Sequence, residues 1–114
     1  DLHNQKILTL EDGHCLRDQA MGYCFSAGAE EDHSFRATSL ETLRYMVASN
    51  MGITLLPQLA TINYAPQQHI RYIPFDSPQP IREIALLCRA GYTRMESVRA
   101  IVSEVRQAVN GLFD

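Results

Sequence analysis

Segments with strand character alternate with segments of helical periodicity along this chain, and this order constrains the fold more than any other feature. An apolar run at residues 6–10 ends at a Glu-Asp-Gly turn, which is typical of a buried strand. Apolar residues then recur at helical spacing over residues 16–26, Gly28 suits the end of that helix, and residues 34–37 have strand character again. We therefore expect an α/β fold of the doubly wound type.

Two capping boxes predict further helices. Thr38 is followed by Glu41 and Thr93 by Glu96, so each threonine is expected to be the N-cap of a helix. The second of these helices carries apolar residues along one face and reaches Gly111, which is expected to be its C-cap glycine.

Three apolar runs, residues 53–56, 70–73 and 84–88, are expected to be strands. A short helix or loop is expected between the first two runs. Two prolines within residues 76–80 force an extended backbone, so this segment is predicted to be a linker.

The composition is that of a folded domain. Of 114 residues, 46% are hydrophobic and 20% are charged, which argues against a disordered chain. The net charge is -3 and the 10 Lys and Arg residues are scattered, so this chain by itself is not expected to bind DNA. No run approaches the roughly 18 apolar residues of a membrane span, and the start lacks signal-peptide features, so a cytoplasmic location is expected. The abrupt start without an initiator Met suggests a fragment of a longer protein.

Three cysteines, Cys15, Cys24 and Cys88, leave at least one thiol unpaired and form no CxxC motif. The set fits neither a secreted disulfide framework nor a four-ligand zinc site. The histidines near Cys15 add no recognised ligand spacing, so neither a metal nor another cofactor is expected. Cys88 lies inside an apolar run and is expected to be a core residue.

The spacing of Cys15 and Cys24 allows two interpretations. In a regular helix, nine residues at about 1.5 Å each separate the two cysteines by roughly 13 Å, whereas a disulfide needs Cα atoms within about 7 Å. The pair can form a disulfide or end a regular helix, but not both at once. Closing this loop contributes about 2.5–3 kcal/mol by chain entropy, enough to compete with a short helix that contains Gly22. On spacing alone, a redox switch and two small core residues both remain open.

The surroundings of Cys15 favour its thiolate form. It lies at the predicted helix start, where backbone N–H groups stabilise negative charge, with His14 beside it and Arg17 two positions on. A thiolate that attacks a peroxide gives a sulfenic acid, which a second cysteine captures as a disulfide. Cys24 lies between two aromatic residues and is expected to be packed, which suits the second role. Arg17 and Asp18 also fit a solvated helix face.

Three segments of the sequence resemble peroxide-sensing transcription regulators of the LysR type. Residues 10–25 read LEDGHCLRDQAMGYCF and residues 35–44 read FRATSLETLR. The third segment, GITLLP at residues 52–57, is a widespread signature of LysR-type effector domains. The resemblance is weaker from residue 63 to residue 89 and returns faintly in the last helix.

The resemblance assigns roles to five residues. It implies that Cys15 attacks hydrogen peroxide and that Cys24 then forms the disulfide with it. It also implies that His14, Arg17 and Asp18 surround and support the reactive thiol. No role is implied for Cys88, and thiol chemistry in such a sensor is stoichiometric, so an enzyme is not expected.

The fold implied by the resemblance is a periplasmic-binding-protein-like regulatory domain, with two α/β subdomains joined by crossing strands. Residues 1–80 would supply most of the second subdomain, and residues 81–114 the returning strand and C-terminal helix of the first. A winged-helix domain outside this chain would make the only contact with DNA. The complete regulator is expected to form dimers and tetramers.

Two other functions remain as alternatives. One is an enzyme of the thiol-peroxidase type, which the lack of a CxxC motif and of a peroxidase-like signature disfavours. The other is a LysR-type effector domain that binds a small organic inducer, with incidental cysteines.

Overall fold

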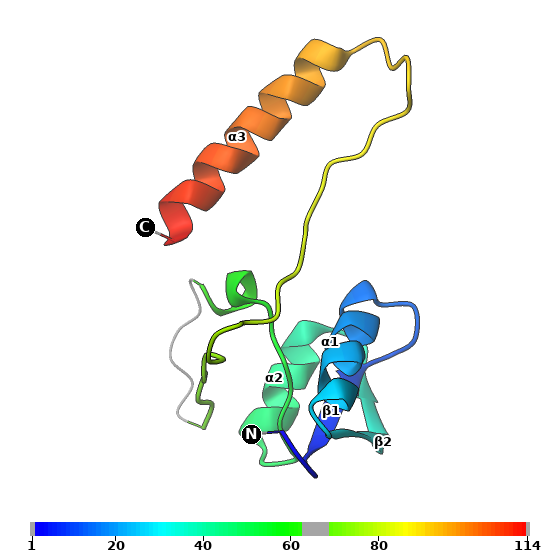
Figure 1. The fold of residues 1–114 in the computed structure, drawn as a ribbon, viewed down its shortest axis with the longest axis vertical. Helices are drawn as coiled ribbons and strands as arrows, with labels where there is room; N and C mark the ends of the chain where they lie inside the picture. The colour runs from blue at the N-terminus through cyan, green and yellow to red at the C-terminus, as the bar shows by residue number, and fades with distance from the viewer. Residues whose placement is uncertain (1, 63–68, 114) are drawn as a thin grey trace. The chain divides into compact units, whose positions relative to one another are not determined.

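The computed structural model describes residues 2–62 and 69–113 and contains two compact units, Asp1–Arg82 and Glu83–Asp114 (Figure 1). The first unit alternates strands and helices, which confirms the predicted α/β class. Its elements, in chain order, are β1 (Lys6–Leu10), α1 (Cys15–Ser26), β2 (Glu30–Ala37), α2 (Leu40–Ala48) and the short 3-10 helix η1 (Gln58–Thr61).

The strands β1 and β2 pair in parallel, as expected when a helix connects them. Their register is interrupted once. Ile7 pairs with Glu31, whereas Thr9, two residues further on, pairs with Arg36. Between these two pairs, β2 has the four residues 32–35 where β1 has only Leu8. This irregularity brings Glu31 and Arg36 together at one place beside β1.

Successive side chains of β1 pack against different helices. Ile7 packs with Cys24 of α1 and Leu8 packs with Leu43 of α2, and all four side chains are buried. Because side chains alternate between the two faces of a strand, α1 and α2 pack on opposite faces of β1. Thr9 therefore shares the α1 face with Ile7. Full burial of each aliphatic side chain contributes roughly 1.5–3 kcal/mol.

The strand predicted at residues 53–56 is reduced to one bridge beside β1. Ile53 bridges Ile7 in parallel, and its carbonyl accepts a hydrogen bond from the Leu8 amide at 2.8 Å. The Thr54 hydroxyl donates to the Leu8 carbonyl at 2.8 Å. The short helix expected after this run is confirmed as η1.

Both capping boxes placed the helix start one residue too early. In α2 the N-cap is Ser39 rather than Thr38, because Ser39 has the extended backbone and its hydroxyl accepts from the Thr42 amide at 3.2 Å. The helix α3 (Met95–Phe113) likewise begins later than a Thr93 cap would give. It also continues through Gly111, so the predicted C-cap was wrong. A glycine costs only about 1 kcal/mol inside a helix and does not end it alone.

The strands predicted at residues 70–73 and 84–88 are not formed among the described residues. A β-branched or aliphatic run becomes a strand only where its backbone finds a partner. In the second unit the run before α3 is extended but exposed, with Leu87 at 91% and Ile84 at 71%. In the part of the chain that the structure describes, no helix is both long and apolar enough to cross a membrane.

Candidate functional site

Cys15 is the first residue of α1 and is exposed to solvent. His14 precedes it as the N-cap, with an extended backbone, and the His14 carbonyl accepts a hydrogen bond from the Arg17 amide at 3.0 Å. The first N–H groups of a helix have no acceptors within it, so negative charge is stabilised there. The fold therefore presents the Cys15 sulfur to solutes at the electropositive end of α1.

Cys24 lies near the other end of α1 and is completely buried with Ile7 and Ala29. The helix end next to it is a Schellman motif, in which the Ala29 amide donates to the Cys24 carbonyl at 2.9 Å and the Gly28 amide to the Phe25 carbonyl at 3.1 Å. Gly28 has φ +82, which suits a glycine and confirms the predicted helix end. Burial raises the pKa of the Cys24 thiol, so this thiol stays protonated at neutral pH while the helix is packed.

The two sulfurs belong to one unbroken helix and both are free thiols. The rise of about 1.5 Å per residue separates the Cα atoms of Cys15 and Cys24 by roughly 13 Å, about twice the reach of a disulfide. The structure thus holds the pair in the thiol arrangement. A bond between these two residues requires that the helix between them unwinds.

Arg17 ties the first turn of α1 to the sheet through a buried carboxylate. One of its guanidinium nitrogens donates to both carboxylate oxygens of Glu31, at 2.8 and 2.9 Å. The same carboxylate accepts hydrogen bonds from the Thr9 hydroxyl at 2.8 Å and from Arg36 Nε at 3.1 Å. The side chain of Glu31 is only 5% exposed. Donors from α1, β1 and β2 therefore meet on one carboxylate, which we call the Glu31 cluster: Thr9, Arg17, Glu31 and Arg36.

The donors around Glu31 keep its carboxylate charged. Burial by itself would raise its pKa, but the hydrogen bond from Thr9 and the positive charges of Arg17, Arg36 and His33 lower the pKa of Glu31 below its ordinary value. The His33 Nδ1 lies 3.6 Å from the carboxylate on an exposed side chain. The cluster is consequently a buried, fully ionised contact at neutral pH.

Asp12, in the turn before α1, adds a second carboxylate at the solvent edge of the cluster. Its two oxygens lie 3.2 Å from Arg17 Nε and 3.4 Å from Arg36. The Asp12 side chain is 81% exposed, so solvent screens these pairs and they contribute little to stability. The buried contact with Glu31 is therefore the one that holds Arg17.

Sequence reasoning missed Glu31. It lies in an acidic run with Glu30 and Asp32, and such a run is usually a solvated surface. The burial depends on the parallel register that sets Glu31 opposite Ile7, and no local pattern reveals that register. The side-chain hydrogen bonds of Arg17 go to this carboxylate and fix the first turn of α1 on the sheet.

The side chains of His14 and Asp18 are exposed in the first turn of α1, near Cys15 in the sequence. Within residues 2–62 and 69–113, neither side chain has an assigned hydrogen bond or ion pair. The roles expected for them beside Cys15 remain predictions.

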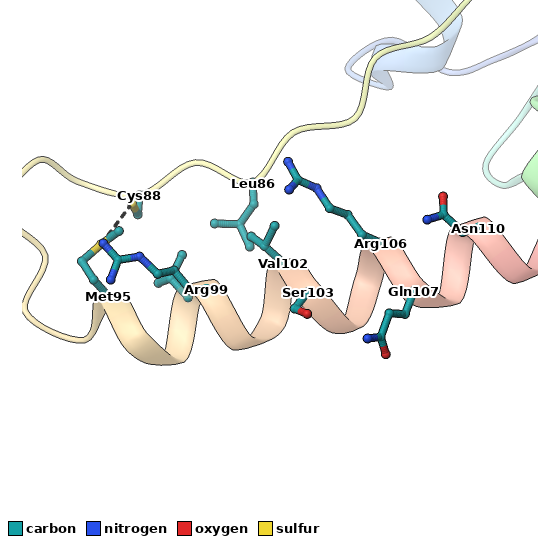
Figure 2. Close-up of a pocket in the computed structure, with 10 residues that line it drawn as sticks. Leu86, Cys88, Met95, Arg99, Val102, Ser103, Arg106, Gln107 and Asn110 are labelled. Carbon is teal, nitrogen blue, oxygen red and sulfur yellow. Dashed lines mark hydrogen bonds between the residues drawn. The ribbon is translucent and has the colours of Figure 1, made fainter.

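Cys88 is exposed, so its expected place in a core was wrong for this chain. Figure 2 shows it at one end of a shallow groove between the extended segment and α3, with its sulfur 4.0 Å from the sulfur of Met95. Leu86 and Val102 line the same groove. The strand that would bury Cys88 is not formed among the described residues, which explains the exposure.

Comparison with known families gives one match over nearly the whole chain. Residues 1–110 match the model of the LysR substrate binding domain. The chain is 52% identical to the hydrogen peroxide-inducible genes activator of Haemophilus influenzae over 97% of its own length and 38% of the relative. It is 51% identical to the DNA-binding transcriptional dual regulator OxyR of Escherichia coli K12, over 100% of this chain and 37% of that protein. The chain thus spans less than half the length of these relatives.

Two solved structures have the same fold as this chain. The oxidised form of OxyR is 51% identical and matches with a TM-score of 0.79, over 100% of this chain and 54% of that chain. The reduced form of OxyR is 46% identical and matches with a TM-score of 0.81, over 100% and 52%. These matches confirm the expected fold class, that of a LysR-type regulatory domain.

Proposed function

This chain belongs to the LysR substrate binding domain family, and from that premise we propose that it senses hydrogen peroxide for a longer transcription activator. The observation that carries the proposal is the placement of two cysteines in one helix, one exposed and one buried, within a sequence half-identical to OxyR. The names of the relatives describe transcription regulators rather than enzymes.

The chemistry proceeds in two steps that balance. The Cys15 thiolate attacks the O–O bond of hydrogen peroxide, which gives a sulfenic acid and, after proton uptake, one water. The Cys24 thiol then attacks the sulfenic sulfur, forms the disulfide and releases the second water. The two electrons that reduce the peroxide come from the two thiols, so no cofactor is needed, and one equivalent of peroxide is consumed.

The helix turns this chemistry into a conformational change. Because Cys24 is buried against Ile7, it meets Cys15 only when α1 leaves the sheet and unwinds. The disulfide contributes about 2.5–3 kcal/mol by chain entropy, which offsets the loss of a short helix that contains Gly22. The oxidised segment then persists in a new conformation until the bond is reduced.

His14, Arg17 and Asp18 are proposed to support the reactive thiol from the first turn of α1. Arg17 would do so by fixing this turn on the Glu31 cluster. His14 and Asp18 would contact the peroxide as it approaches Cys15, since both side chains are exposed to solvent near Cys15.

The rest of the regulator is proposed from the family. Residues 1–80 would form most of the second regulatory subdomain, and residues 81–114 would complete the first. A winged-helix domain elsewhere in the protein would bind DNA in the cytoplasm. The regulator would act as a dimer or tetramer whose subunit packing responds to the disulfide.

Thiol counting tests this function directly. One equivalent of hydrogen peroxide should remove two thiols from the reduced chain and leave one. Mass spectrometry of peptides should find Cys15 linked to Cys24 and Cys88 free, and Cys88→Ser should give the same link as the matched control. A dominant link to Cys88 would overturn the assignment.

A further inference from the structure

We propose that Glu31 is a positioning residue of the redox switch, whose carboxylate holds Arg17 and thereby keeps the Cys15 turn of α1 in the thiol conformation. This inference rests on the proposed function, since it concerns the same pair of cysteines. Glu31 touches neither sulfur in this role and acts through Arg17 alone.

The position of Arg17 in the chain is the first argument. Arg17 lies between Cys15 and Cys24, inside the stretch that a disulfide must unwind. Its partner Glu31 lies outside that stretch, on β2. Any rearrangement that brings the two cysteines together moves one partner of the contact and leaves the other in the sheet.

The anchoring of Glu31 is the second argument. Its carboxylate is held by the Thr9 hydroxyl of β1 and by Arg36 Nε of β2, at 2.8 and 3.1 Å. Both donors belong to the sheet, so the carboxylate stays in place when α1 unwinds. Arg17 is the one donor of the Glu31 cluster that comes from the moving helix.

The burial of the Arg17–Glu31 contact is the third argument, because it makes the contact costly to break. The side chains of Arg17 and Glu31 are 12% and 5% exposed, so water does not replace the contact fully when it breaks. A hydrogen bond between charged groups changes an equilibrium by about tenfold or more. An interaction present in the thiol form and lost in the disulfide form shifts the equilibrium toward thiols by that factor.

The consequence is a threshold for oxidation. With the Glu31 cluster intact, the Cys15–Cys24 disulfide should form only under more oxidising conditions than it would without the cluster. In a glutathione buffer, the thiols of Cys15 and Cys24 lose two electrons and two protons to glutathione disulfide, which becomes two glutathione thiols. The equilibrium constant of this exchange measures the threshold without peroxide and without DNA.

The central test compares Glu31→Gln with Glu30→Gln in the 114-residue chain. The control removes the neighbouring exposed carboxylate and leaves the cluster intact. After equilibration in glutathione buffers of graded ratio, thiols are trapped by alkylation and counted by mass. Glu31→Gln should raise the equilibrium constant for disulfide formation about tenfold, a shift of about 30 mV to more negative potential, and the control should match the unchanged chain. Equal midpoints for all three proteins would overturn the inference.

A double-mutant cycle tests whether Glu31 acts through Arg17. Arg17→Gln alone should shift the midpoint in the same direction, and the double variant should shift it no further than the larger single change. Fully additive shifts would mean that Glu31 acts by another route and would refute the inference.

Thr9→Val serves as a milder variant if circular dichroism shows that Glu31→Gln does not fold. It removes one anchor of the carboxylate without changing any charge, and a smaller shift in the same direction is expected. An unshifted midpoint in folded Thr9→Val would count against the inference. If the unchanged chain forms no Cys15–Cys24 disulfide in any buffer, the proposed function fails together with this inference, whereas a normal disulfide with unshifted variants refutes the inference alone.

Discussion

Cys15 and Cys24 share the helix α1 but occupy opposite environments, because Cys15 is exposed at the first residue and Cys24 is completely buried against the sheet. The two thiols are therefore unequal before any oxidant arrives. A solute meets the first sulfur directly, whereas it meets the second only after α1 opens.

The first prediction is a large difference in alkylation rate between these two thiols. At neutral pH, iodoacetamide should modify Cys15 much faster than Cys24, because burial both shields Cys24 and raises the pKa of its thiol. Peptide mapping after short reaction times reports each rate. In concentrated urea the two rates should converge, and a difference that persisted there would show that folding is not its cause.

The second prediction separates the roles of the two cysteines. Cys15→Ser should abolish the fast reaction with peroxide, whereas Cys24→Ser should still form a sulfenic acid that is not captured within the chain. Labelling with dimedone, which traps sulfenic acids, should mark Cys15 in the Cys24→Ser variant. Cys88→Ser provides the control for loss of an unrelated exposed thiol. Equal loss of the first step in both variants would contradict the proposed roles.

Local patterns in the sequence predicted the elements at residues 6–48 of the first unit well. Three of these features depend only on residues that are neighbours in the sequence: the strand at residues 6–10, the helix that follows it and the glycine that ends that helix. The runs at residues 70–73 and 84–88 failed for the opposite reason. A strand exists only with a partner, and a β-branched or aliphatic run carries no information about whether that partner is present.

The candidate site likewise contains residues that the sequence predicted and one residue that it did not. Cys15 and its helix N-terminus follow from the local pattern. The burial of Cys24 was predicted too, although this side chain packs with Ile7 and Ala29 rather than with its aromatic neighbours in sequence. Glu31 does not follow from the local pattern, because its burial depends on the parallel register that sets it opposite Ile7. Its carboxylate pairs with Arg17, which belongs to a different element, and only the three-dimensional arrangement shows this pairing.

The third prediction concerns the pH dependence of stability. The pKa of Glu31 is lower in the folded chain than its ordinary value, so the unfolded chain binds the proton more tightly. The stabilisation is thus present above about pH 4.3, the ordinary pKa of Glu, and is lost as pH falls through the lower folded value. Urea unfolding of Glu31→Gln should show a free energy about 1.5–3 kcal/mol lower at neutral pH.

Below about pH 4.3 the unfolding free energy of the unchanged chain should fall more steeply than that of Glu31→Gln. Glu30→Gln should follow the unchanged chain at every pH, since it leaves the contacts of the buried Glu31 carboxylate intact. Parallel curves for all three proteins would mean that Glu31 does not stabilise the fold through its charge.

The last prediction concerns the change in structure that the Cys15–Cys24 disulfide causes. The two cysteines cannot pair while a regular helix separates them, so oxidation must break the backbone hydrogen bonds of α1. Hydrogen exchange should therefore show lost protection across residues 16–25 in the oxidised chain. Protection along residues 39–51 should shift as well, because Leu16 of α1 packs against the core cluster that contains Leu43 of α2. Cys24→Ser treated with the same peroxide is the matched control, since it gains the sulfenic acid without the bond and should keep its protection. If the disulfide forms while both segments exchange as before, the thiol chemistry stands but the conformational switch does not.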